Sequence, residues 1–165
     1  NGVAMTSSIE DAFGSRILVE GFLLNNQLTD FSFSAGVVNA PGPGKRPRSA
    51  MAPVVVVDRA GRLVGLLGSP GGSRIPNYLA QTLVGLVDWR LDPDQAVAQP
   101  RVGSRNGATE LEAGTAAEAA APFLMALGHP VAEVDTTSGV HLIWRGRGGW
   151  RGAADPRREG LALGE

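Results

Sequence analysis

The sequence predicts an α+β protein in which an antiparallel or mixed sheet is covered by helices. Two observations carry this prediction. Residues 52–58 and 63–67 are apolar runs joined by the turn at 59–62, which is typical of a hairpin of fully buried strands. Helical segments follow this hairpin, and the apolar runs at 131–134 and 140–144 return to strand patterns. The order of elements is therefore strands, a hairpin, helices and strands again.

The first thirty residues should hold two extended segments. Residues 2–8 alternate apolar and small side chains, and residues 17–24 form a second apolar segment. Between them Ser7 and Glu10 fit the Ser-x-x-Glu capping box of a helix; a cluster of polar side chains is the other interpretation. Residues 25–31 are rich in hydrogen-bonding side chains, which either cap loops or bind a polar ligand.

Residues 34–48 are rich in glycine, proline and alanine, which predicts an irregular surface loop. Three cations, Lys45, Arg46 and Arg48, stand at its end. Such a group forms either an anion-binding patch or a solvated loop.

The stretch Gly68-Ser69-Pro70-Gly71-Gly72-Ser73-Arg74-Ile75 connects the second hairpin strand to a helix that we expect from about Asn77. A glycine pair adopts backbone angles that other residues avoid, and its N–H groups are not covered by side chains. Two such groups aimed at one point would stabilise the oxyanion of an acyl-transfer reaction. A tight turn without a ligand is the alternative. The stretch lacks the Gly-Lys-Ser/Thr ending of a nucleotide-binding loop.

Helix signals dominate the second half of the chain. Asp92 and Pro93 fit an N-cap followed by proline at the first helical position. Residues 110–112 form a brief strand pattern, and residues 115–127 form an alanine-rich helix that Gly128 ends. The basic run 145–149 should be a turn, and irregular structure is expected from residue 152 onward.

Composition limits the possible functions. The chain has 165 residues, 43% of them hydrophobic and 19% charged, which suits a single domain over residues 1–165. A net charge of −1 gives no reason to expect nucleic acid as a partner, and no apolar run is long enough to span a membrane. Without cysteine, and with two distant histidines, no metal site is predicted. We expect His129 and His141 to be structural, because no serine-bearing elbow accompanies them.

Several of these stretches occur together, in an order that resembles the small, C-terminal subunit of the gamma-glutamyltransferase (glutathione hydrolase) family. The resemblance covers nearly the whole chain. The matching runs are residues 23–31, 44–53 and 68–75, with weaker matches at 96–101, 128–131 and 152–160.

The resemblance implies an N-terminal-nucleophile hydrolase, an αββα sandwich of which this chain would be the small-subunit portion. In that family one precursor cleaves itself, and the new N-terminal threonine attacks the gamma-glutamyl amide to form an acyl-enzyme. Water, an amino acid or a peptide then accepts the acyl group. The implied partners are the large subunit of the same precursor and a small gamma-glutamyl donor. The resemblance implies no cofactor, and it suggests a periplasmic or extracellular location.

The resemblance also implies residue roles. Gly71 and Gly72 match the oxyanion-hole donors, and Ser8 matches a hydroxyl that hydrogen-bonds the nucleophile. Glu10, Gln27 and Asp30 match the residues that hold the α-ammonium of the donor, which needs acceptors. Ser49 matches the first serine of a pair that binds the donor's α-carboxylate.

Two departures from the family pattern matter. The nucleophilic threonine is expected upstream of Asn1, so we expect this chain alone to be inactive. Ala50 stands where the family has the second serine, and the loss of a hydrogen bond to a charged group costs about 1.5–3 kcal/mol. A cephalosporin- or glutaryl-acylase-like amidase and a non-catalytic fragment are therefore the alternatives.

Overall fold

Residues 1–164 are described by a computed structural model, in which the chain divides into two compact units. Unit 1 consists of residues 1–6 together with the chain from residue 50 onward, and unit 2 consists of residues 7–49. A single domain over the whole chain stays a prediction.

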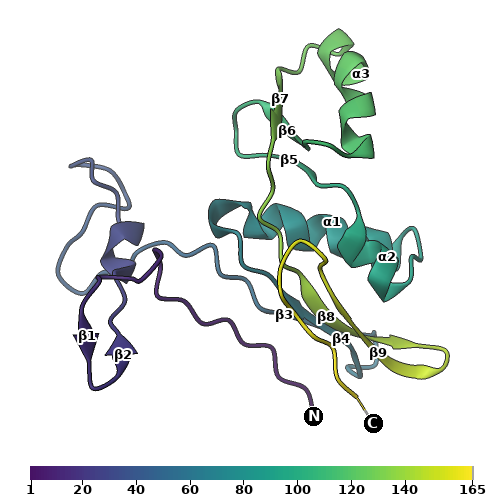
Figure 1. The fold of residues 1–165 in the computed structure, drawn as a ribbon, viewed down its shortest axis with the longest axis horizontal. Helices are drawn as coiled ribbons and strands as arrows, with labels where there is room; N and C mark the ends of the chain where they lie inside the picture. Colours follow the sequence, from purple (N-terminus) through teal and green to yellow (C-terminus); the bar gives the residue numbers. More distant parts are fainter. Residues whose placement is uncertain (165) are drawn as a thin grey trace. The chain divides into compact units, whose positions relative to one another are not determined.

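The hairpin predicted from the sequence supplies two strands of a four-stranded sheet in unit 1. Strands β3 (Val54–Val57), β4 (Leu63–Gly68), β8 (His141–Gly146) and β9 (Gly149–Ala154) lie in the order β3-β4-β8-β9, and every pair is antiparallel (Figure 1). A single register row crosses all four strands through Val55, Leu66, Ile143 and Gly152. The predicted hairpin is thus confirmed.

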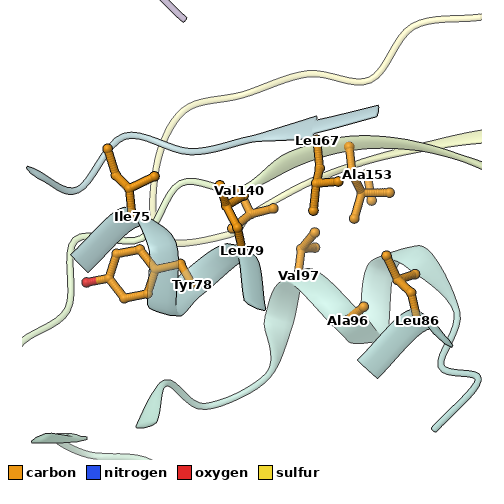
Figure 2. Close-up of a cluster of buried hydrophobic side chains, with 10 residues drawn as sticks. Leu67, Ile75, Tyr78, Leu79, Leu86, Ala96, Val97, Val140 and Ala153 are labelled. Carbon is orange, nitrogen blue, oxygen red and sulfur yellow. The ribbon is translucent and has the colours of Figure 1, made fainter. Parts of the chain in front are cut away.

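Two helices cover one face of this sheet. Helix α1 (Ile75–Val87) begins two residues before the predicted start, since Pro76 suits the first turn of a helix. Helix α2 (Pro93–Ala98) begins as predicted, with Asp92 at its N-cap, whose N–H donates to Gln95 Oε1 at 3.1 Å. The core lies between the helices and the sheet and is formed by Leu67, Ile75, Tyr78, Leu79, Leu86, Ala96, Val97, Val140, Leu142 and Ala153 (Figure 2).

A second, three-stranded sheet belongs to the same unit. Strand β6 (Thr109–Glu112) pairs antiparallel with β5 (Val102–Ser104) and parallel with β7 (Val131–Val134). The crossover between β6 and β7 contains the 3-10 helix η3 (Ala116–Ala120) and α3 (Ala121–Ala126). The single helix expected over 115–127 is therefore divided, and Pro122 lies in the first turn of α3 because proline is tolerated there and not in a helix interior.

Unit 2 contains little regular structure. Strands β1 (Leu18–Val19) and β2 (Phe22–Leu23) form a short hairpin, and η1 (Gln27–Asp30) is one 3-10 turn. The one extended segment expected over 17–24 was wrong, because Glu20 and Gly21 adopt positive φ angles of 49° and 85° and reverse the chain. The predicted irregular loop over 34–48 is confirmed.

Further expectations were wrong, and the helix-cap interpretation of Ser7 and Glu10 is excluded. Residues 2–8 form no paired strand, and no helix follows Ser7, since Glu10 has a φ of 72°. Strand β3 is not fully buried: Val54 and Val56 are partly buried against the core, and Val55 and Val57 are each 55% exposed. Strand β9 extends to Ala154, where irregular structure was expected, because residues 149–154 pair with β8 over their whole length. None of the helices within residues 1–164 is both long and apolar enough to cross a membrane.

Candidate functional site

The glycine turn, residues 69–72, connects the end of β4 to the helices that follow it. Gly71 has φ 132° and ψ 12°, and Gly72 has φ 58°. A Cβ added to Gly71 would lie 2.6 Å from Tyr78 Cε2, whereas one added to Gly72 would meet nothing within 4 Å. Glycine at position 71 is thus required both by its backbone angle and by the neighbouring ring.

The N–H groups of the glycine pair are available to a ligand. Within residues 1–164 neither Gly71 nor Gly72 donates a hydrogen bond from its backbone N–H. The short helix η2 (Gly72–Arg74) then leads into α1. Unpaired backbone N–H donors of this kind are the groups that a negatively charged oxygen needs as partners.

The arginine closest to this turn in the sequence has a partner. Arg74 donates to both carboxylate oxygens of Glu110, at 2.6 and 3.0 Å, and Arg105 adds a bond of 2.7 Å to the same carboxylate. These hydrogen bonds lower the pKa of Glu110 to about 2. Because the Arg74 guanidinium is bound to Glu110, we assign anion binding at the turn to the N–H groups of Gly71 and Gly72.

A cluster of buried charged side chains, centred on Arg101 and Asp155, holds together the elements that follow the glycine turn. Arg101 is 2% exposed and Asp155 is 1% exposed, and Arg101 Nη2 lies 2.9 Å from Asp155 Oδ2. Burial alone would raise the pKa of Asp155, but the Ser138 hydroxyl, the Arg157 N–H and guanidinium, and Arg101 lower it to about 2. Arg101 also donates to Thr82 Oγ1 and to the Val97 carbonyl, so α1 and α2 are tied to the same cluster.

Glu112 extends this cluster toward β6. Its carboxylate accepts hydrogen bonds from the Arg157 guanidinium and from Thr136 Oγ1, the latter at 2.6 Å. Burial opposes ionisation of Glu112, but these donors outweigh it and its pKa is lowered. Both buried carboxylates are therefore charged and fully paired, which suits structural support better than proton transfer.

Unit 2 brings three of the predicted site residues together. Gln27 Nε2 donates to Asp30 Oδ2 at 2.6 Å and to Glu10 Oε2 at 3.1 Å. Two carboxylates thus converge on one N–H₂ group, in an arrangement that would also accept hydrogen bonds from an ammonium ion. Glu10 has a positive φ of 72°, and Ser8 Oγ accepts the Glu10 N–H at 2.8 Å.

Neighbouring asparagines act as loop caps. Asn26 Oδ1 accepts the Asp11 N–H, and Asn25 Oδ1 accepts the Gln27 N–H. Of the two interpretations of residues 25–31, capping therefore holds for both asparagines. Gln27 and Asp30 instead face Glu10 through their side chains.

Ser49 is exposed at the end of the loop over 34–48. Asn39 organises this loop: its Nδ2 donates to the Asp30 carbonyl at 2.7 Å, and its Oδ1 accepts the Arg48 N–H at 3.0 Å. Lys45 Nζ donates to the carbonyls of Val38 and Ala40, both at 2.7 Å. Lys45 therefore closes the loop on itself.

Sequence reasoning missed Asn39, Ser69, Ser138, Asp155 and Arg157. Asp155 and Arg157 belong to the Asp-Pro-Arg run near the end of the chain, for which the sequence predicted only irregular structure. The partners of these residues lie up to 70 positions away in the sequence, so spacing could not identify them. The described residues contain no group of three or more histidine, cysteine or acidic side chains placed to hold a metal ion.

Comparison with known proteins places the chain in a family. The model of the family described as gamma-glutamyltranspeptidase matches residues 1–165. The chain belongs to the gamma-glutamyltranspeptidase family. It is 37% identical to the glutathione hydrolase proenzyme of Escherichia coli K12 over 95% of this chain and 29% of that protein. It is also 35% identical to the acylase ACY 1 proenzyme of Pseudomonas sp. SE83, over 84% of this chain and 25% of that protein.

The fold agrees with the same family. The gamma-glutamyltranspeptidase of Pseudomonas nitroreducens, in its W525D mutant, matches 100% of this chain and 93% of the solved chain, with 32% identity and a TM-score of 0.87. The fold is thus α+β, the small-subunit portion of the N-terminal-nucleophile hydrolase fold, as predicted. The chain spans at most about a third of the length of the curated glutathione hydrolase proenzymes that it matches.

Proposed function

We propose that this chain is the small-subunit portion of an enzyme that hydrolyses or transfers gamma-glutamyl groups. The observation that carries the proposal is the glycine turn, with two unpaired N–H groups after a buried strand in a gamma-glutamyltranspeptidase family member. Donors fixed in place before the reaction stabilise the charge that develops on a carbonyl oxygen.

In the proposed reaction an N-terminal threonine upstream of Asn1 supplies the nucleophile. Its hydroxyl oxygen bonds to the gamma-carbonyl carbon while its α-amine takes the hydroxyl proton, and the carbonyl electrons move to the oxygen. The N–H groups of Gly71 and Gly72 stabilise this oxyanion. The amide C–N bond then breaks, the leaving amine takes the proton, and an acyl-enzyme ester remains for water or an amine to attack.

The donor's charged end would be held by unit 2. Glu10 and Asp30 offer carboxylate oxygens to the donor's α-ammonium, in place of the hydrogen bonds that they now accept from Gln27. Gln27 then adds its own side-chain oxygen as a further acceptor for the ammonium. Ser49 contributes a hydroxyl to the α-carboxylate, and Ser8 hydrogen-bonds the nucleophile. The remaining contacts come from the large subunit of the same precursor, in keeping with relatives that are named proenzymes.

An acylase-like activity is the alternative, because the chain is also similar to an acylase proenzyme and because Ala50 departs from the serine pair of the gamma-glutamyl enzymes. Without a second serine the site has one hydroxyl donor fewer for a donor α-carboxylate. A glutaryl amide has the same distal carboxyl as a gamma-glutamyl amide without the ammonium. The two activities therefore differ in whether the Glu10, Gln27 and Asp30 cluster is used.

Turnover of two substrates by the complete precursor separates these activities. Gamma-glutamyl anilide should be hydrolysed, and Ala50→Ser should raise kcat/KM for it. Hydrolysis of a glutaryl amide but of no gamma-glutamyl donor would establish the acylase alternative. A correctly folded precursor with no amidase activity at all would leave the non-catalytic alternative standing.

The glycine turn predicts a graded effect of two substitutions in that protein. Gly71→Ala should lower kcat about 100-fold or more, because a Cβ meets Tyr78 and displaces the N–H donor. Gly72→Ala should lower kcat by about tenfold or less, since its φ of 58° and open surroundings tolerate alanine at moderate cost. Undiminished kcat in both variants would refute the oxyanion role.

A further inference from the structure

The peptide group between Pro70 and Gly71 is held in place by a hydrogen bond from one buried hydroxyl group. Ser69 is 5% exposed, and its Oγ donates to the Pro70 carbonyl at 2.6 Å. The same Oγ accepts the Gly139 N–H at 3.2 Å, so its own proton is left for Pro70. This peptide is planar and trans, so fixing the carbonyl also fixes the Gly71 N–H, which points the opposite way.

Gly139, whose N–H bonds to Ser69, belongs to residues 136–139, a segment that several hydrogen bonds hold in place. Thr136 Oγ1 donates to Glu112, and Ser138 Oγ donates to Asp155 Oδ2. The Thr137 carbonyl accepts from Arg158 Nε at 2.9 Å. Residues 136–139 are therefore connected to the buried ionic cluster by side chains and by backbone.

The segment also packs directly on the glycine turn. A Cβ added to Gly139 would lie 2.8 Å from Pro70 Cγ, so the Gly139 backbone lies directly against the Pro70 ring. The Thr137 N–H reaches Tyr78 Oη at 3.4 Å, and the Tyr78 ring lies against Gly71. The anchored segment thus supports the turn through both Pro70 and Tyr78.

We propose that Ser69 is a positioning residue that aims the Gly71 N–H, and that Ser138 transmits to it the rigidity of the Arg101–Asp155 pair. This inference rests on the proposed function, because it assigns a task to the oxyanion donor. Neither serine touches the substrate. Their effect falls on the transition state, since a donor displaced by a fraction of an ångström loses its bond to the oxyanion.

The experiment measures kcat, KM and Tm for Ser69→Ala, Ser138→Ala, the double variant and a control in the complete precursor. The control is Ser104→Ala, which removes an exposed hydroxyl bonded to the Gly107 carbonyl. Each single variant should lower kcat about tenfold with KM unchanged, and Ser104→Ala should change neither. The kcat of the double variant should be only slightly lower than that of the less active single variant, because both serines act on the Gly71 N–H through the same chain of contacts.

Several results would overturn the inference. They are a kcat for Ser69→Ala equal to that of the control, multiplied losses in the double variant, a rise in KM in place of a fall in kcat, or losses that simply follow Tm. Failure of the proposed function looks different. In that case the unsubstituted precursor itself hydrolyses no acyl amide, and the inference falls with it.

Discussion

Three acidic side chains of this chain are stabilised in their charged form by neighbouring arginine side chains. Asp155, Glu112 and Glu110 each accept at least one arginine hydrogen bond, and each has a lowered pKa. A lowered pKa means that the folded state binds the proton less tightly than the unfolded state does. These carboxylates therefore stabilise the fold above their ordinary pKa values and cease to do so in acid.

Glu110 offers a clean test of this dependence. Its folded pKa of about 2 lies below the ordinary 4.5, so its contribution is complete above about pH 5 and is lost as the pH falls toward 2. Glu110→Gln should lower the free energy of unfolding by about 2 kcal/mol at pH 7, and by much less at pH 2.5. Urea unfolding at both pH values measures this, with exposed Glu133→Gln as the control. A difference that does not depend on pH would refute the assignment.

The sequence could predict site residues where they are neighbours in a motif, and could not where the fold assembles them. Gly71 and Gly72 adjoin a strand pattern, so a turn with bare N–H donors was readable from the sequence. Ser69 and Gly139 are 70 residues apart, and Arg101 and Asp155 are 54 apart. Such partners meet only because β8 and β9 complete the sheet beside β4.

At the scale of elements, strand pairing is tightened by a glycine beneath an aromatic ring. Gly65 of β4 lies opposite Trp144 of β8, and a Cβ added to Gly65 would lie 2.2 Å from Trp144 Cε3. Trp144 packs against the core and has limited freedom to move away. The second hairpin strand therefore depends on the absence of a side chain at position 65.

Gly65→Ala should accordingly destabilise the protein by about 1–3 kcal/mol, because overpacking forces Trp144 out of its position. Gly107→Ala is the matched control, since a Cβ there meets nothing within 4 Å. Thermal unfolding of both variants measures the difference. Equal Tm values for the two would show that Trp144 yields without cost.

Elements were predictable where one local signal decides them. The hairpin of β3 and β4 follows from two apolar runs around a turn, and α2 follows from its Asp-Pro start. The short hairpin of β1 and β2 was missed because Glu20, a residue without turn preference, adopts a positive φ. The exposure of Val55 was missed because a run of four valines shows no alternation between buried and exposed positions.

For the molecule as a whole, the four-stranded sheet has one face covered by α1 and α2 and a second face that is also apolar. Val55, Leu66 and Ile143 lie in one register row on this second face. Val55 is 55% exposed and Ile143 is 45% exposed. Apolar surface of this kind is typical of a protein interface, and the proposed large subunit is the partner that we expect to cover it.

Val55→Asp should therefore weaken association with the large subunit, because a carboxylate on this face would be buried without a partner. Copurification of the two subunits after cleavage of the precursor measures the effect. Val84→Asp, which alters an exposed residue of α1, is the control and should leave association unchanged. Equal recovery of both complexes would place the partner elsewhere.

The N–H groups of Gly71 and Gly72 are central to the proposed chemistry, because they are the donors assigned to the oxyanion of acyl transfer. A crystal structure of the complete protein with a tetrahedral boronate or phosphonate adduct on its nucleophile tests this assignment most directly. We predict one adduct oxygen at about 2.7–3.1 Å from both glycine nitrogens. An adduct whose oxygens all bind other donors, with both glycine N–H groups left unpaired, would contradict it.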